Sequence, residues 1–147
     1  MATLDEAWEL SRDDRGLTIV STARADGTIQ SSLVNSGVLA HPATGDQRLA
    51  FVAIGTARVK LANLRVRPQI TAVFRNGWRW AAVEGRAELA GPADPQPWLD
   101  AERLRLLLRD IYAAAGGTHD DWDTYDRVVA EEGRTAVLIT PTRVYSD

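Results

Sequence analysis

The sequence predicts a mainly β protein, a small barrel of six antiparallel strands with inserted helices. Six segments carry the alternating or continuous apolar pattern of strands. Two pairs of these segments are joined by Asp-Gly or Asn-Gly turns, which favour hairpins. The helical segments fall between hairpins instead of after every strand, which favours an antiparallel sheet over a doubly wound parallel one. Closing such a sheet into a barrel removes its open edges.

The first half of the chain is predicted to contain one short helix and three strands. The second strand follows a turn at Asp26 and Gly27, where glycine tolerates the positive φ of a tight hairpin. The loop that follows it contains His41 and Pro42. In order, the elements are a helix over residues 4–11 and strands over residues 16–23, 29–40 and 48–54.

The second half is predicted to contain three helices and three strands. Thr56 can cap the first of these helices and Pro68 ends it. A turn at Asn76 and Gly77 joins two strands, and Pro141 is expected to interrupt the last strand. In order, the elements are a helix between residues 55 and 68, strands over 69–74 and 78–89, helices over 98–115 and from 120 or 121 to 132, and a strand over 135–145.

Composition excludes several classes of protein. The 147 residues, 45% of them apolar, suit one domain over residues 1–147. The absence of cysteine excludes disulfides, a thiolate nucleophile and Cys-ligated metals, and fits a cytoplasmic protein. A net charge of −3 argues against a nucleic-acid or anionic-membrane surface. With no long apolar run and an acidic amino terminus, the chain is expected to be soluble and cytoplasmic.

Familiar catalytic motifs are missing. His41 and His119 lie in predicted loops, and no G-x-S-x-G sequence supplies a serine nucleophile for a hydrolase. The acidic residues between His119 and Asp123 are of metal-binding types, but capping of the following helix explains them better, so we expect no metal site. No G-x-G-x-x-G or Walker A sequence supports Rossmann or P-loop nucleotide binding.

Two cations begin the predicted helix between residues 55 and 68. Arg58 and Lys60 lie in its first turn, and Lys60 is the single lysine of the chain. Free backbone N–H groups at a helix amino terminus favour an anion, and these side chains add a forked donor and a point charge. The pair is therefore a candidate phosphate site. The alternative is that both are basic side chains on a solvated helix face.

Two further groups of residues suggest a flat ligand. Trp78 and Trp80 point to the same side of a strand, because side chains two residues apart share a face. They are suited to wall a planar molecule, or to serve as core or dimer-interface aromatics. The second strand is unusually polar, and its side chains need partners that a heteroaromatic ring can supply. These polar residues are Gln30, Ser31, Ser32 and Asn35.

In their order along the chain, these features resemble the flavin-binding split-barrel superfamily, the pyridoxamine-phosphate-oxidase-like proteins. The matching elements are the Asp26-Gly27 hairpin, the polar second strand, Arg58-x-Lys60-x-x-Asn63-Leu64-x-x-x-Pro68 and the Asn76-Gly77 hairpin that ends in Glu84-Gly85-x-Ala87. Residues 77–85, 119–125 and 141–145 are more specifically similar to the actinobacterial deazaflavin (coenzyme F420)-dependent reductases. The Arg-rich carboxy-terminal motif of true pyridoxamine-phosphate oxidases is missing, so oxidation of vitamin B6 is not expected.

The resemblance implies a six-stranded split β-barrel of the FMN-binding type. It also implies a homodimer with two cofactor sites at the subunit interface, and it assigns roles by position. Arg58 and Lys60 are expected to hold the cofactor phosphate, with backbone from Val59; Gln30, Ser31, Ser32 and Asn35 to line the ring and ribityl chain; and Trp78, Arg79 and Trp80 to approach from the partner subunit.

The activity that the resemblance implies is hydride transfer. Reduced F420 is expected to give a hydride to a planar conjugated acceptor such as a quinone, an enone or a tetrapyrrole-like molecule. FMN in place of F420, giving a flavin reductase or oxidase, is the alternative on the same fold. A non-catalytic carrier of flavin or haem is a third reading, since a fold alone does not determine an activity. No residue stands out as the proton donor.

Overall fold

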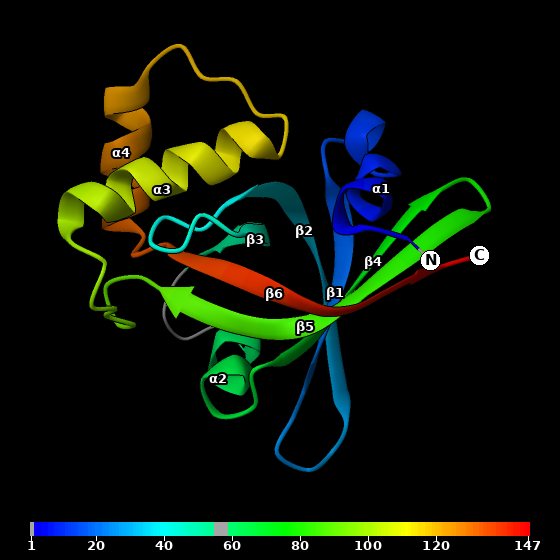
Figure 1. Ribbon diagram of the computed structural model, residues 1–147. Coiled ribbons are helices and arrows are strands. Elements are labelled where there is room, and N and C mark those ends of the chain that lie inside the picture. The colour runs from blue at the N-terminus through cyan, green and yellow to red at the C-terminus, as the bar shows by residue number, and fades with distance from the viewer. Residues whose placement is uncertain (1, 55–58) are drawn as a thin grey trace.

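The computed structural model describes residues 2–54 and 59–147, which fold into a closed barrel of antiparallel strands (Figure 1). Around the barrel the strands follow the order β1-β2-β3-β6-β5-β4. The predicted fold class is confirmed. The strands are β1 (Leu17–Ala23), β2 (Ile29–Ala40), β3 (Gln47–Ala53), β4 (Gln69–Asn76), β5 (Arg79–Ala90) and β6 (Thr135–Ser146). The helices are α1 (Leu4–Glu9), the 3-10 turn η1 (Arg12–Asp14), α2 (Val59–Val66), α3 (Ala101–Ala114) and α4 (Trp122–Glu131).

The main core fills the barrel. Alternate side chains of each strand point inward, as the period of a β-strand requires, and Phe51 and Phe74 are fully buried there. Trp8 of α1 and Leu61 of α2 extend this core on different sides of the barrel (Figure 1). The Trp8 indole N–H donates to the Ser36 carbonyl at 2.9 Å, which satisfies its polar edge. The two short helices therefore cover the interior.

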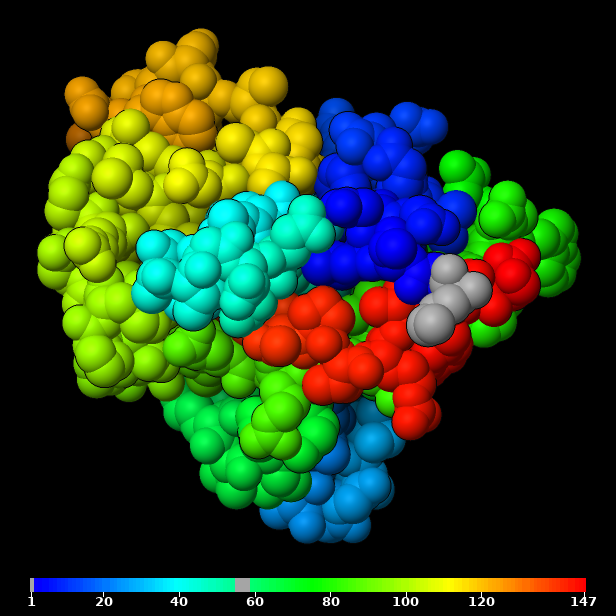
Figure 2. Space-filling model, viewed as in Figure 1, coloured from blue at the N-terminus to red at the C-terminus, as the bar shows by residue number. Residues whose placement is uncertain are grey.

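A second core lies outside the barrel, under α3 and α4. Leu107, Leu108 and Ile111 of α3 pack on Ala50 of β3 and Leu138 of β6. Figure 2 shows these helices as one yellow-to-orange mass against the cyan connection between β2 and β3. The carboxyl end of α3 comes so near β2 that a Cβ on Gly37 would lie 2.5 Å from the Ala114 carbonyl carbon. Glycine at this position lets helix and strand approach closely.

Hydrogen bonds and ion pairs tie α4 to α3. The Asp121 carboxylate accepts from the Thr124 backbone N–H at 3.1 Å, so the capping interpretation of the acidic cluster is confirmed. Asp126 of α4 accepts from Arg109 Nε at 2.9 Å and from Arg105 Nη1 at 3.1 Å. These bonds hold the pKa of the Asp126 carboxyl below its ordinary value, with the Arg109 bond the largest cause.

Most predicted element ends lie within two residues of the observed ones, but the interruption of β6 and the start of α3 are wrong. β6 runs without interruption from residue 135 to 146, because the register shifts between Glu84 and Gly85 of β5 and Pro141 pairs at that irregularity. A proline is tolerated at a bulge, where no ladder hydrogen bond is required of it. α3 begins at Ala101 instead of residue 98, because Asp100 caps it through a bond from the Arg103 N–H.

No helix in residues 2–54 and 59–147 combines the length and the apolar character needed to cross a membrane.

Candidate functional site

Lys60 is the second residue of α2, and its side chain contacts the polar strand β2. Its side chain is buried, with 8% exposed, and its ammonium donates to Ser32 Oγ at 3.0 Å. On the same side of the barrel, Asn63 donates to Thr22 Oγ1 at 3.0 Å, and Thr22 donates to Gln30 Oε1 at 3.3 Å. The structure thus brings Lys60, Ser32 and Gln30 of the predicted site into one polar cluster. Arg58 and Thr56 lie outside the described residues.

The alternation of β2 divides the predicted site residues between two faces. Gln30 and Ser32 point toward the interior beside α2, while Ser31 and Asn35 point outward. Ser31 Oγ lies 2.8 Å from Ser21 Oγ of β1, its cross-strand neighbour. The polar cluster and the outward residues therefore lie on opposite sides of one strand.

A cavity of about 600 Å³ lies between the outer face of β2 and β3 and the carboxyl end of α3. Its volume is in the range of small-molecule sites. Among the predicted site residues, Asn35 is the one that lines it within the described parts of the chain. The lining residues are Arg15, Asn35, Val52, Ile54, Ile111, Tyr112, Ala115, Gly116, Gly117, Thr118, Tyr125 and Arg134.

The cavity combines aromatic rings with positive charge. The hydroxyls of Tyr112 and Tyr125 donate to the carbonyls of Thr118 and Leu108, each at 3.1 Å. Burial raises the pKa of the Tyr125 hydroxyl, so this group is neutral at pH 7. Arg134 forms an ion pair with Glu132 at 2.7 Å. The arrangement suits a planar ligand with a negative or electron-rich edge.

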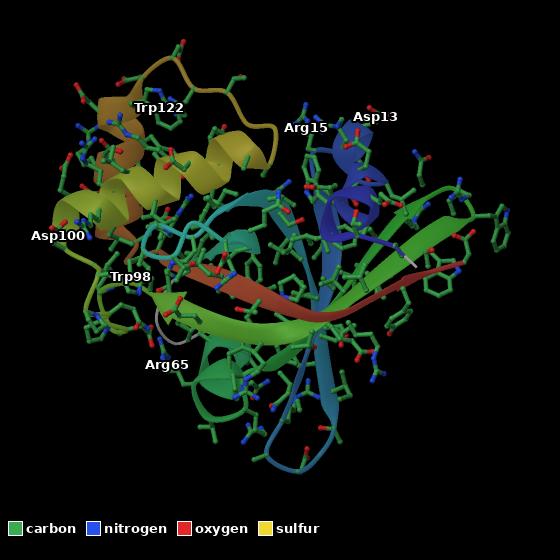
Figure 3. The ribbon with its side chains drawn as sticks, viewed as in Figure 1. Asp13, Arg15, Arg65, Trp98, Asp100 and Trp122 are labelled. Atoms are coloured by element: carbon green, nitrogen blue, oxygen red, sulfur yellow. The ribbon has the colours of Figure 1, made fainter. Side chains whose placement is uncertain are left out.

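Arg15 reaches the cavity through an unusual turn. Its φ of +57° and that of Gly16, +67°, place two consecutive residues in the left-handed region. Asn35 Nδ2 donates to the Arg15 carbonyl at 3.1 Å, and the Ser36 N–H donates to the Gly16 carbonyl at 2.8 Å. A Cβ on Gly16 would lie 2.1 Å from the Ser36 carbonyl oxygen, so glycine is required there. Figure 3 shows Arg15 beside the end of α3.

The two predicted tryptophans lie far from these groups within one chain. Trp78 is 98% exposed at the tip of the β4–β5 hairpin, on the opposite side of the barrel from α3 and α4 (Figure 1). Trp80 packs edge-on against Tyr145 at 6.2 Å between ring centroids, and Arg79 lies 3.5 Å from Asp147 in an ion pair. One protomer therefore does not bring this hairpin to Lys60 or to the cavity.

An apolar row crosses the outer face of the barrel. Strand pairing places Leu33, Ile19, Val73, Ala82 and Tyr145 side by side on β2, β1, β4, β5 and β6. All but Ala82 are exposed. Large apolar side chains in one exposed row mark a contact surface. We call this set the outer-face row.

Neither histidine lines the cavity. His41 is buried, and its Nδ1 accepts from the Ala43 N–H at 3.0 Å, so Nε2 carries the proton that binds Glu88 at 2.6 Å. This bond ties the loop after β2 to β5. His119 accepts from the Asp121 N–H at 3.0 Å and packs among Tyr112, Trp122 and Tyr125. Within the parts of the chain described, no group of three or more metal-binding side chains comes together.

Sequence reasoning missed most of the cavity wall. Arg15, Tyr112, Tyr125 and Arg134 are separated by long stretches of chain and meet because α3 and α4 pack on the outside of the barrel. The local signal available was the Gly116-Gly117 pair, which ends α3 and leaves the backbone open at the cavity edge.

Comparison with known proteins identifies the fold. No family model matches the sequence. A conserved hypothetical protein from Mycobacterium tuberculosis superposes with a TM-score of 0.67 at 18% identity, over 99% of this chain and 84% of that one. An F420 reductase superposes with a TM-score of 0.56 at 21% identity over 88% of both chains. A pyridoxamine 5'-phosphate oxidase-related FMN-binding protein from Nostoc punctiforme gives a TM-score of 0.61 at 15% identity, over 97% of this chain and 80% of that one.

Proposed function

We propose, from the pyridoxamine-phosphate-oxidase-like split-barrel fold of this chain, that it is an oxidoreductase of the F420-dependent kind. The proposed reaction transfers a hydride from reduced F420 to a planar conjugated acceptor such as a quinone, an enone or a tetrapyrrole-like molecule. The observation that carries the proposal is the cavity of about 600 Å³ on the outer face of β2 and β3, with Asn35 in its wall.

The residues fit a phosphorylated tricyclic cofactor. The cavity has room for such a ring, and Val52, Ile54 and Tyr112 offer apolar and aromatic surface to it. Lys60 supplies a buried cation for a phosphate, and its ammonium contacts Ser32 of β2.

Each predicted residue then has a proposed task. Lys60, with Arg58 two residues earlier, would bind the phosphate. Ser32 and Gln30 would orient Lys60 and the ribityl chain through the polar cluster. Asn35 would hold the edge of the ring, and its amide is already oriented by the bond to the Arg15 carbonyl. Ser31 and the backbone of Val59 would complete the site.

When bound, the reduced cofactor supplies the hydride. The protein's part is to hold the acceptor face to face with the ring and to exclude water. Tyr112 and Tyr125 are suited to this, since both hydroxyls are engaged with backbone carbonyls and their rings remain for packing. Burial raises the pKa of the Tyr125 hydroxyl, which therefore stays neutral near pH 7.

The proposed active form is a homodimer. The outer-face row exposes large apolar side chains on four of its five strands, and a second copy of the chain would cover them. The β4–β5 hairpin with Trp78, Arg79 and Trp80 extends beyond the barrel (Figure 1) and would reach the partner's cofactor site. This explains an almost fully exposed tryptophan.

The test is a binding titration of the purified full chain with F420 and with FMN. We expect oxidised and reduced F420 to bind and FMN to bind more weakly. Tight FMN binding without F420 binding would contradict the F420 proposal. Stopped-flow oxidation of bound F420H2 by a panel of quinones and tetrapyrroles then measures the transfer. An acceptor-independent rate would identify a carrier.

FMN dependence is the second candidate. The phosphate site at Lys60 serves FMN and F420 equally, and an FMN-binding protein is among the structures with this fold. A yellow protein on purification, with the absorption spectrum of FMN, would favour this candidate over the first.

A further inference from the structure

We propose that the cavity accepts a planar molecule bearing a carboxylate, and that Arg15 and Arg134 receive this group. The inference rests on the proposed function for the role of the ligand as hydride acceptor. Its chemical class comes from the cavity itself, which carries charge and shape independent of any cofactor.

The charge of the cavity is positive. Its wall contains Arg15 and Arg134, and among the described lining residues there is no aspartate or glutamate. Arg134 is paired with Glu132. Arg15 makes no ion pair within residues 2–54 and 59–147, although Asp13 and Asp14 precede it in the chain. In a protein of net charge −3, a positive cavity attracts anions selectively.

The backbone of Arg15 supports a ligand-binding role. A side chain with a Cβ is strained at a φ of +57°, where glycine or asparagine is the ordinary choice. The Arg15 guanidinium makes no hydrogen bond or ion pair among the described residues, so the fold gains no polar side-chain interaction from arginine there. An unfavourable conformation that places a free cation in a cavity is typical of a functional site.

The position of Arg15 assigns the carboxylate to the acceptor. Arg15 lies beside Asn35 on the outer face of β2, whereas Lys60 contacts Ser32, which points to the opposite side of this strand. The carboxylates of F420 belong to a tail that continues from the phosphate, on the side away from the ring. With the phosphate at Lys60, this tail would lie on the α2 side of β2, so Arg15 on the cavity side is left for the acceptor.

The shape of the cavity wall indicates what kind of molecule carries the carboxylate. Tyr112 contributes an aromatic ring, and Val52 and Ile54 contribute branched apolar side chains. Such a wall favours a flat conjugated body, and the arginine fork matches a carboxylate with two parallel bonds. An uncharged quinone would fill the apolar part and leave both arginines without a ligand.

The experiment uses two fluorescent probes and the full chain without cofactor. The probes are 9-anthracenecarboxylate and its neutral amide, which share one flat ring system. We expect the wild type to bind the carboxylate about tenfold more tightly than the amide, and salt at about 0.5 M to reduce this preference. Arg15→Gly keeps the left-handed turn without strain and removes the guanidinium. It should lose most of the preference and leave amide binding unchanged.

Arg127→Gln is the matched control, because Arg127 is an exposed arginine of α4 outside the cavity wall. It should keep the full preference. Equal binding of both probes to the wild type, or an undiminished preference in Arg15→Gly, would overturn the inference. Because these titrations contain no cofactor, they remain decisive even if neither F420 nor FMN binds.

A final titration separates the two sources of a carboxylate. Arg15→Gly should bind F420 and FMN with wild-type affinities, and should show a raised KM for a carboxylated quinone but not for its neutral analogue. Weaker binding of F420 with unchanged binding of FMN would assign Arg15 to the cofactor tail. That result would overturn the assignment to the acceptor.

Discussion

Lys60 illustrates how one side chain serves two purposes. Its stem is buried beside the core residues of α2, and its ammonium reaches Ser32 of β2. Burial of an ammonium is unfavourable unless polar partners surround it. The structure buries Lys60 and does not place it on an exposed helix face, and this burial supports the proposed phosphate site more than an exposed basic residue would.

Lys60→Met tests the phosphate site while keeping the apolar stem. Loss of a hydrogen bond to a charged group should weaken cofactor binding by about 1.5 to 3 kcal/mol, or roughly tenfold to 150-fold. The dissociation constants for F420 and FMN, with the melting temperature as a check on folding, measure this. Arg127→Gln should bind both cofactors normally. Unchanged affinity in Lys60→Met would place the phosphate elsewhere.

Gly37 lies where β2 meets the carboxyl end of α3, so an added methyl group should disturb this packing next to the cavity. A Cβ there would meet Ala114 and Ala115 at 2.5 to 2.6 Å, and backbone atoms cannot yield easily. Gly37→Ala should lower the free energy of unfolding by roughly 1 to 3 kcal/mol, as overpacking does. Denaturant titration measures it. Ala40→Ser, at the exposed end of the same strand, should change it by less than about 0.5 kcal/mol.

At the scale of elements, local patterns predicted most of the architecture. The boundaries of β2 match exactly at residues 29 and 40, since alternation and a turn signal mark both ends. The end of α2 before Pro68 was predicted too, because proline does not continue a helix. The continuity of β6 was not predicted, because it depends on an irregularity in the neighbouring strand β5. A single strand's sequence does not contain its partner's register.

The docking of α4 should depend on pH through Asp126. Its folded-state pKa lies below the ordinary value, so its contribution to stability is complete above the unfolded pKa of about 3.9 and is lost as pH falls through the lower folded pKa. Trp122, in α4 and stacked under Arg109, reports this by fluorescence. We expect α4 to loosen below about pH 4 in the wild type.

Asp126→Asn removes the charge at every pH. It should destabilise the protein at pH 7 and flatten the acid transition of Trp122 fluorescence, because the bonds to Arg105 and Arg109 lose their charged acceptor. Asp123→Asn is the control, since this exposed residue of the first turn of α4 attracts Arg109 through space but makes no hydrogen bond or ion pair with Arg105 or Arg109 within the described chain. An Asp126→Asn transition identical to that of the wild type would contradict the assignment.

At the scale of the whole molecule, the outer-face row makes a clear prediction about assembly. Leu33→Glu places a charge in the proposed contact surface, at the β2 end of the row, where desolvation is unfavourable. The variant should be monomeric by light scattering and should lose cofactor binding along with the dimer. Val66→Glu changes an equally exposed apolar side chain of α2 outside the row and should remain dimeric. A monomeric wild type would contradict the proposal.

The candidate site divides into a part that sequence can reveal and a part that it cannot. Ser32 and Lys60 were visible as unusual residue types in a strand and at a helix start, and the structure joins them. The cavity wall was hidden, because Arg15, Tyr112 and Arg134 meet through packing between elements distant in the chain. Contacts that involve a second protomer lie beyond any pattern in one chain.

The pairing of Ala90 with Ala136 joins the ends of β5 and β6 on adjacent strands. The segment over residues 91–134, which contains α3 and α4, therefore leaves and rejoins the barrel at neighbouring points. Evolution or protein engineering can lengthen, shorten or exchange this segment while the barrel strands keep their hydrogen bonds. Because this segment supplies one wall of the cavity, such exchanges would change which small molecules the cavity can hold without rebuilding the barrel.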